Sequence, residues 1–301
     1  MTAQNTDNPR PSRPKRASQS GGIVIQGDAG DTSRRSRRRD GREHSMTRES
    51  VAGDTGTWSG RDPIHAVFFD FADTLFSSRR LREVHLRQLR FVGDTIGVTA
   101  SDDELRASYR EGLGVAYRSV ASRPYYLHRE LFGQAFIGMA RTFGRELDHE
   151  QAGYAVDRQY EATIEAAELR ADCLASLRGL RERGLHVQIV SNIDEDQLEK
   201  LVRRLGLESA IDACTSSESA QSCKPDPGIY ESALEKARCT AAQVLFVGDS
   251  PAHDVTGPQA IGMLTALLVA DVRPGAEDCS PDFVIERLGQ VVEIVEQELV
   301  G

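Results

Sequence analysis

The sequence predicts an α/β fold, with a parallel sheet core and an inserted all-helical segment. Short apolar runs that end in polar residues recur along the chain, as at 64–69, 186–190 and 243–247, and buried parallel strands have this form. From residue 172 onward, such runs alternate with stretches of helical periodicity, which indicates βαβ units with right-handed crossovers. We therefore expect a Rossmann-like core.

Local signals place the core elements. Gly184 and Gly206 suit left-handed C-caps at the ends of two helices, and Pro227 suits the first turn of a third. The expected strands are 64–69, 186–190, 210–214, 243–247, 264–269 and 283–285. The expected core helices are 172–183, 195–205, 227–237, 254–261 and a terminal helix that ends at about residue 299.

The segment 79–169 carries only helical patterns, whereas a parallel crossover needs a single helix. Ser101 and Glu104 have the spacing of a capping box, and the helix that they open should stop before Pro124. The expected helices are 79–96, 101–123, 125–143 and 148–168. The surplus of helices divides the chain into a core, 61–78 with 170–301, and a separate helical domain over 79–169.

The first 60 residues differ in kind from the rest. They are rich in Ser, Gly, Asp, Pro and Arg and have almost no apolar periodicity, so we expect a disordered tail. The arginine-rich run at 34–39 is interpreted as part of a solvated tail, or as sequence upstream of a true start at Met46. The alternative is that this run contacts nucleic acid or an anionic partner.

The composition argues against several classes of protein. A net charge of −9 argues against a nucleic-acid partner for the folded part. No apolar run approaches the length of about 20 residues that a membrane span needs, and we expect no signal peptide. The five cysteines contain no C-x-x-C pair, which predicts reduced thiols in a cytoplasmic protein.

Polar motifs follow the expected strands, where an open α/β sheet forms its ligand crevice. Asp70 ends the first strand, and Ser191-Asn192 follows the second. Lys224 lies in Lys-Pro-Asp-Pro, and Asp249 and Asp254 lie in Gly-Asp-Ser-Pro-Ala-His-Asp. Together these supply a nucleophile, a hydroxyl donor, a fixed cation and an acidic metal site. This set suits phosphoryl transfer through a covalent aspartyl intermediate.

The order and spacing of these motifs resemble the haloacid dehalogenase superfamily of hydrolases, most of which are phosphatases, over residues 64–270. The resemblance implies that a helical cap over the crevice sets specificity, and that the substrate is a small phosphorylated metabolite. It implies Mg²⁺ as the cofactor, bound by Asp70, the backbone carbonyl of Ala72, Asp249 and Asp254. The implied catalytic residues are Asp70 as nucleophile, Thr74, Ser191, Asn192 and Lys224.

Ala72 departs from the family pattern, because most phosphatases of the family have a second Asp there as general acid and base. Loss of such a group lowers the rate roughly 10²–10⁴-fold. Asp73 is one residue late, and adjacent side chains in such a turn point in different directions, so we do not expect it to replace the acid. The enzyme is therefore expected to prefer leaving groups that depart as stable anions.

Alternative functions remain open from the sequence. A 2-haloacid dehalogenase-like hydrolase needs no acid at position 72, although those enzymes usually have an aromatic residue there. A catalytically impaired binding protein of the same fold is another. A phosphonatase is excluded because its cap lysine has no counterpart between Lys15 and Lys200. His253 is expected to be an exposed loop residue. The oligomeric state is left open, and candidate anion contacts are Arg79, Arg80, Arg123 and His128.

Overall fold

The computed structural model describes residues 63–77, 81–269 and 279–300. The expected tail, with its arginine-rich run and Met46, lies outside the described residues, as do Arg79 and Arg80. No helix within the described ranges is long and apolar enough to cross a membrane.

Six parallel strands form one sheet in the order β3-β2-β1-β4-β5-β6, which confirms the predicted α/β fold. Phe69 at the end of β1 lies opposite Ile189 of β2 and Val247 of β4. The first strand is therefore central, and the segments after β1, β2 and β4 emerge at one edge. The strands are β1 (Ala66–Phe69), β2 (His186–Ser191), β3 (Ala213–Ser216), β4 (Val244–Gly248), β5 (Leu264–Leu268) and β6 (Phe283–Ile285).

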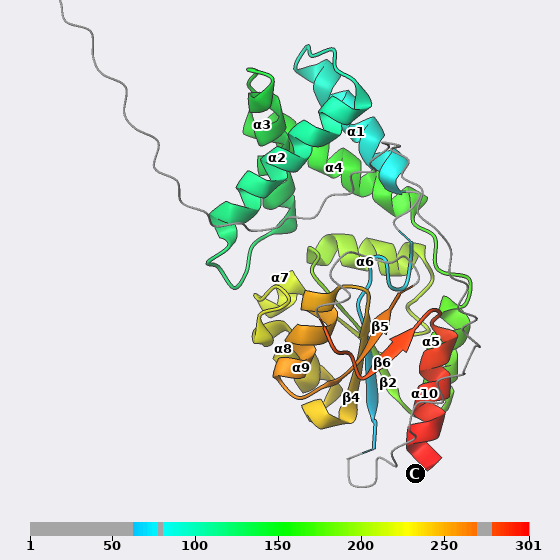
Figure 1. Ribbon diagram of the computed structural model, residues 1–301. Coiled ribbons are helices and arrows are strands. Elements are labelled where there is room, and N and C mark those ends of the chain that lie inside the picture. Colours follow the sequence, from blue (N-terminus) through cyan, green and yellow to red (C-terminus); the bar gives the residue numbers. More distant parts are fainter. Residues whose placement is uncertain (1–62, 78–80, 270–278, 301) are drawn as a thin grey trace, which may run out of the picture. The chain divides into compact units, whose positions relative to one another are not determined.

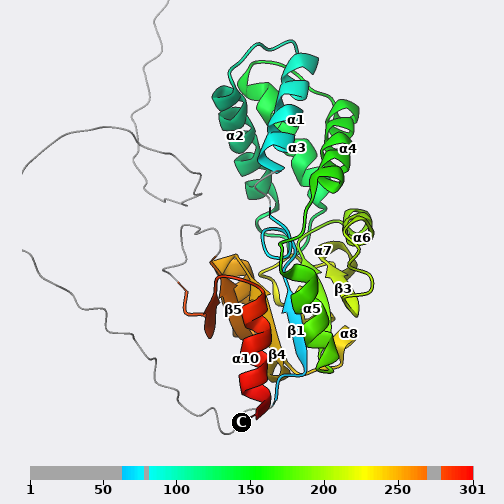
Figure 2. The same cartoon turned by 90° about the vertical axis from the view of Figure 1, so that its right-hand side faces the viewer.

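Helices cover both faces of the sheet (Figures 1 and 2). Val67 and Phe69 pack in one apolar cluster with residues of α5, α6 and α10, while Ala66 and Phe68 pack in a second cluster with α8. Burial on both sides explains why β1 is a continuous apolar run instead of an alternating one. These helices are α5 (Cys173–Glu182), α6 (Glu195–Arg204), α8 (Pro227–Ala237) and α10 (Gly289–Val300).

The segment after β4 differs from the expected helix over 254–261. It forms a π-helical stretch, η2 (Pro251–Thr256), followed by the short helix α9 (Gly257–Ala260). Asp254 folds back to accept hydrogen bonds from two backbone N–H groups that precede η2. His253 is half-buried in η2, and its carbonyl accepts a hydrogen bond from the Tyr230 hydroxyl (2.5 Å). The prediction of an exposed loop histidine was therefore wrong.

Two short helices had no counterpart in the sequence prediction, namely α7 (Ser217–Ala220) and the 3-10 turn η1 (Ala241–Gln243). Each is too short to show a period of its own in the sequence. The strand expected at 210–214 is shifted toward the C-terminus and runs through Ser216, whose side chain then caps α7.

The first four helices after β1, which we call the insertion, have an apolar cluster of their own, which includes Leu89, Phe136 and Val156. Figures 1 and 2 show the four helices packed together. The capping box at Ser101 and Glu104 is present, and Asp148 forms a second one with Gln151. The helices are α1 (Leu81–Thr95), α2 (Asp102–Val120), α3 (His128–Thr142) and α4 (His149–Ala166).

Glycines allow α2 and α3 to approach closely. A Cβ atom at Gly112 would lie 2.4 Å from the carbonyl oxygen of Ala135 and 2.8 Å from the backbone nitrogen of Met139. A Cβ atom at Gly138 would lie 2.6 Å from the Cα of Gly112. The two backbones are therefore in direct contact, and a methyl group at either position needs the helices to separate.

We predict that Gly112→Ala destabilises the protein by about 1–3 kcal/mol, because the added methyl group overpacks a backbone contact. This sign is opposite to that of helix propensity, which favours alanine over glycine. Urea unfolding of the two chains measures the difference. The matched control is Gly179→Ala in α5, where the added Cβ would have ordinary contacts of 3.6 Å or more. Equal or higher stability of Gly112→Ala would contradict the close contact.

Candidate active site

Three charged side chains meet at the edge of the sheet where β1 and β4 end. The Lys224 ammonium nitrogen lies 2.6 Å from Asp70 Oδ1 and 2.8 Å from Asp254 Oδ1. All three residues are buried, with 4% of Lys224 and 1% of Asp254 exposed. Asp70 directly follows β1, Asp254 lies in η2, and Lys224 lies between α7 and α8. Residues from three parts of the sequence thus come together, and two carboxylates contact one ammonium group.

Burial disfavours the charged form of each group in this cluster, and the opposite charges of the neighbouring groups counteract that effect. Burial raises the pKa of Asp70, and the Lys224 ammonium opposes that effect. Burial alone would lower the pKa of Lys224, but the Asp254 and Asp70 carboxylates outweigh it and raise that pKa. Lys224 is therefore a permanent cation beside Asp70.

Asp254 is held in place by the backbone of its own loop. Its Oδ2 accepts hydrogen bonds from the backbone N–H groups of Asp249 (3.1 Å) and Ser250 (2.9 Å). A Cβ atom at Gly248 would lie 2.3 Å from Asp254 Cγ. A residue without a side chain is therefore required at the end of β4 for the Asp254 carboxylate to fold back over it.

Asn192 positions the backbone of Lys224. The Asn192 side-chain amide donates to the Lys224 carbonyl (2.9 Å), and the Lys224 N–H donates to Asn192 Oδ1 (2.6 Å). These two hydrogen bonds resemble those between paired strands, and they fix the backbone from which the lysine side chain extends. Of the expected Ser191-Asn192 pair, the amide therefore contacts Lys224, while Ser191 lines the neighbouring cavity.

Thr74 links two of the acidic residues. It is fully buried, and its hydroxyl lies 3.2 Å from Asp70 Oδ2 and 3.5 Å from Asp249 Oδ1. In the turn from Asp70 to Thr74, Asp73 has a φ of 64°, in the left-handed region that favours glycine. The turn therefore returns Thr74 to the carboxylate that precedes it by four residues.

Arg170 secures this turn, a role that the sequence did not indicate. Its guanidinium donates to the backbone carbonyls of Asp73 (2.5 Å) and Thr74 (2.9 Å). Arg170 follows the insertion in the sequence, and no motif distinguishes it from the other arginines. Its partners are backbone groups, which no residue type in the sequence reveals.

Three carboxylates could hold a divalent cation. Oxygen atoms of Asp70, Asp249 and Asp254 all lie within 4.8 Å of one another. The Lys224 ammonium group stands beside two of these carboxylates. Carboxylate oxygens suit a hard cation such as Mg²⁺ or Ca²⁺.

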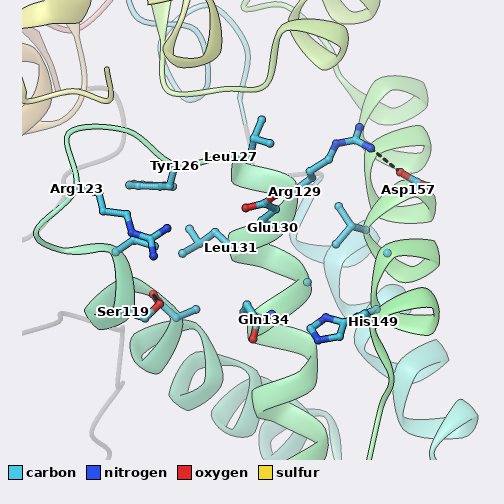
Figure 3. A pocket seen from close by; sticks show the side chains of 16 residues that line it. Ser119, Arg123, Tyr126, Leu127, Arg129, Glu130, Leu131, Gln134, His149 and Asp157 are labelled. Atoms are coloured by element: carbon cyan, nitrogen blue, oxygen red, sulfur yellow. Dashed lines mark hydrogen bonds and ion pairs between the residues drawn. The ribbon is translucent and has the colours of Figure 1, made fainter. Parts of the chain in front are cut away.

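A cavity of about 380 Å³ adjoins this cluster. From the core, Phe71, Ala72, Ser191 and Asn192 line it, and from the insertion His85, His128, Phe132 and Tyr160 line it. The structure therefore brings His128, one of the expected anion contacts, to the same cavity as Ala72. Another of these, Arg123, lines a different cavity, which lies within the insertion (Figure 3).

Asp194 joins the core to the insertion, and the sequence suggested only that it starts α6. Its buried carboxylate forms no cap bond with that helix. Instead it accepts the backbone N–H groups of His128 (2.7 Å) and Arg129 (2.8 Å), the first two residues of α3, and the Tyr160 hydroxyl (3.0 Å). Asp194 thus caps a helix of the insertion, and helix N-termini attract negative charge.

His128 is held at this junction with one ring nitrogen free of hydrogen bonds. Its Nδ1 is buried and has no hydrogen-bond partner, at 3.8 Å from Asp194 Oδ1. Burial lowers the pKa of His128 to about 4, although the charge of Asp194 acts in the opposite direction. The imidazole is therefore neutral at physiological pH.

Comparisons with known proteins agree with this geometry. The family model described as haloacid dehalogenase-like hydrolase matches residues 64–262. The glyceraldehyde 3-phosphate phosphatase of Methanopyrus kandleri is 26% identical over 241 residues, which cover 78% of this chain and 98% of the relative.

Two solved structures have the same fold. The putative hydrolase YfnB from Bacillus subtilis, bound to magnesium, has a TM-score of 0.64 at 19% identity and covers 78% of this chain and all of its own. The L-2-haloacid dehalogenase from Xanthobacter autotrophicus, with chloropropionic acid covalently bound, has a TM-score of 0.61 at 23% identity, over 77% of this chain and 98% of its own.

We predict that Lys224→Met destabilises the protein by about 3–5 kcal/mol at neutral pH, because it leaves buried carboxylates without their counter-charge. A carboxyl group whose pKa is raised by folding stabilises the folded state at low pH and loses that effect as the pH rises. The deficit should therefore shrink as the pH is lowered and Asp70 becomes protonated. Urea unfolding with a chelator present measures it.

The matched control for this substitution is Lys236→Met. Lys236 is exposed and donates to the Cys214 carbonyl (2.7 Å), so its removal should change stability little at any pH. Equal effects of the two substitutions, or a deficit of Lys224→Met that grows in acid, would contradict the burial of uncompensated carboxylates.

Proposed function

Because the chain belongs to the haloacid dehalogenase-like hydrolases, we propose that it is a magnesium-dependent phosphatase of a small phosphorylated metabolite. The observation that carries this proposal is the Lys224 ammonium group bound to Asp70, whose neighbours in sequence, Phe71 and Ala72, line a cavity. A carboxylate paired with a fixed cation is arranged to attack a phosphoryl group and to compensate the charge of its oxygens. The phosphatase from Methanopyrus kandleri supports the substrate class.

In the proposed first step, an Asp70 oxygen forms a bond to phosphorus while the ester bond to the leaving oxygen breaks. The product is an acyl phosphate on Asp70, and the ester oxygen leaves with the bonding electron pair. Lys224 compensates the negative charge of the phosphoryl oxygens, and the Ser191 hydroxyl, at the cavity wall, donates a hydrogen bond to one of them. Water then attacks the phosphorus, releases phosphate and restores the carboxylate.

The residues for the cation are Asp70, Asp249 and Asp254, with the backbone carbonyl of Ala72 as a fourth oxygen. Both Asp254 oxygens are already hydrogen-bonded, one to Lys224 and the other to backbone N–H groups. We therefore assign direct contact to Asp70 and Asp249, and assign to Asp254 the positioning of Lys224. Bound Mg²⁺ would neutralise charge on the phosphoryl oxygens and orient them for in-line attack.

Ala72 lines the cavity with a methyl group where a proton donor would stand. Asp73 does not fill the gap in our proposal, because its left-handed backbone belongs to the turn that Arg170 holds. The enzyme then acts best on esters whose leaving group is a stable anion, such as an aryl or acyl phosphate. The small-molecule substrate enters the cavity between the core and the insertion, which serves as the cap.

A 2-haloacid dehalogenase is the second candidate. Ala72 favours it, because a halide leaves without a proton, and the cavity wall includes apolar groups such as Phe71, Phe132 and Ile193. The acidic cluster of Asp70, Asp249 and Asp254 favours the phosphatase, since removal of halide does not require a cation. The five cysteines form no disulfide within the part of the chain that the structure describes, which supports a cytoplasmic location for either enzyme.

We predict that Asp70→Asn abolishes hydrolysis with the fold intact, because an amide has nearly the same shape as the carboxylate but is a poor nucleophile. Release of phosphate from an aryl phosphate and the circular dichroism spectrum measure the two effects. Asp73→Asn is the matched control and should retain turnover. More than trace activity in Asp70→Asn would assign the nucleophile to another residue.

We predict that Ala72→Asp raises turnover of an alkyl phosphate by about tenfold or more, because it supplies a proton to a poor leaving group. The effect on an aryl phosphate should be small, since that leaving group needs no acid. Turnover of both substrates at saturating magnesium measures the ratio, with Asp73→Ala as the control.

Selective loss of alkyl phosphate turnover in Asp73→Ala would show that Asp73 is the acid. Cleavage of a 2-haloacid without added metal, with no phosphate cleaved by any of these chains, would replace the phosphatase with the dehalogenase. Absence of turnover with both substrate classes, in the wild type and in Ala72→Asp, would favour the binding protein.

A further inference from the structure

The insertion contains a cavity of its own, with a volume of about 540 Å³ (Figure 3). It is lined by residues of α2, α3, α4 and the segment between α2 and α3. None of its lining residues lines the cavity beside Asp70. Its volume falls in the range of small-molecule sites, roughly 300–1,000 Å³.

Two glycines in the walls of this cavity have no structural explanation. Gly133 of α3 and Gly153 of α4 line it, and a Cβ atom at either position would meet nothing within 4 Å. Neither has a positive φ, so neither conformation requires glycine. Glycine inside a helix is less stable than alanine, and Gly112 and Gly138 are explained by a backbone contact that these two lack. Their shared effect is to widen the cavity.

Opposite charges remain without ion-pair partners in the cavity. Arg129 and Asp157 pair with one another across it (3.4 Å), as Figure 3 shows. Arg123 and Glu130 also line the cavity, where both are exposed to solvent, and neither forms an ion pair with any residue that the structure describes. Figure 3 shows the guanidinium of Arg123 near Ser119 and on the same side of the cavity as Tyr126.

We propose that this cavity binds a small zwitterion of the amino-acid class. The carboxylate of the ligand is bound by Arg123, whose planar guanidinium matches it in two hydrogen bonds. The ammonium group is bound by Glu130. Leu127 and Leu131 supply an apolar wall for the ligand's side chain. An anion alone would leave Glu130 unpaired beside it, and a cation alone would do the same to Arg123.

The wall of the cavity also contacts the core next to Lys224. The Cys223 N–H donates to the Pro124 carbonyl (2.7 Å), and the backbone N–H groups of His128 and Arg129 donate to Asp194. A ligand that holds the segment between Arg123 and Arg129 therefore acts on the neighbours of the catalytic lysine. This consequence rests on the proposed function, and we expect the ligand to change the KM for the hydrolysed phosphate.

The test is calorimetric titration of the full chain with free L-amino acids at millimolar concentration, followed by the N-acetyl and amide derivatives of each amino acid that binds. We expect at least one amino acid to bind, and both of its derivatives to bind more than about tenfold more weakly, which a lost charge pair would cause. Arg123→Gln and Glu130→Gln should each weaken binding of the free amino acid by a similar factor.

The substitutions Gly133→Ala and Gly153→Ala distinguish an effect on ligand binding from an effect on folding stability. Each adds a methyl group to open space in the cavity, so binding should fall while the melting temperature of the unliganded chain stays the same or rises. Gly179→Ala in α5 is the matched control, since it makes the same change in a helix remote from the cavity, and it should leave binding unchanged.

Four results would overturn the proposal. They are the absence of binding by every amino acid, equal binding of a derivative that lacks one charge, full binding by Arg123→Gln, and binding abolished by Asp70→Asn. The last would place the ligand in the active site. Binding with no change in KM would overturn the proposed effect on the neighbours of Lys224, while the proposed binding site would stand. If no phosphatase activity is found, the titration can still be interpreted, because it measures binding without turnover.

Discussion

The contact of the Lys224 ammonium group with Asp70 and Asp254 is the interaction on which the active site depends. A buried charge is stable only when other charges and hydrogen bonds compensate it. The two carboxylates keep the lysine protonated, and the lysine allows both carboxylates to be buried. Asp249 adds a further acidic group at the same place. The arrangement that holds the lysine therefore also brings together three carboxylates that could hold a cation.

The sheet explains how residues so far apart in the sequence form this cluster. β1 pairs with β2 on one side and with β4 on the other, so the segments that follow these strands are neighbours at one edge. The loop after β2 supplies Asn192, which fixes the backbone of Lys224, and the loop after β4 supplies Asp254, which fixes its ammonium group. Lys224 is thereby held at both ends by the segments that follow the two strands flanking β1.

The sequence allowed the sheet, its helices and the charged cluster to be predicted, since apolar runs ending in Asp70, Ser191 and Gly248 mark strand ends directly. The roles of Arg170 and Asp194 could not be predicted. Both bind backbone groups of remote segments, and a backbone group leaves no residue-type signal in a sequence. The helix expected over 254–261 was replaced by η2 and α9 for a related reason, since Asp254 returns to the backbone before it.

The start of α3 lines both the cavity within the insertion and the cavity between the insertion and the core. Leu127 and Arg129 line the cavity within the insertion, whereas His128, between them, lines the one beside Asp70. The Asp194 carboxylate binds the backbone at this point, so a rotation of the helix start would move both walls at once and would break a hydrogen bond to a buried charge. A continuous drift is therefore unfavourable, and in our proposal an occupant of either cavity would act on the other through whether this contact is made or broken.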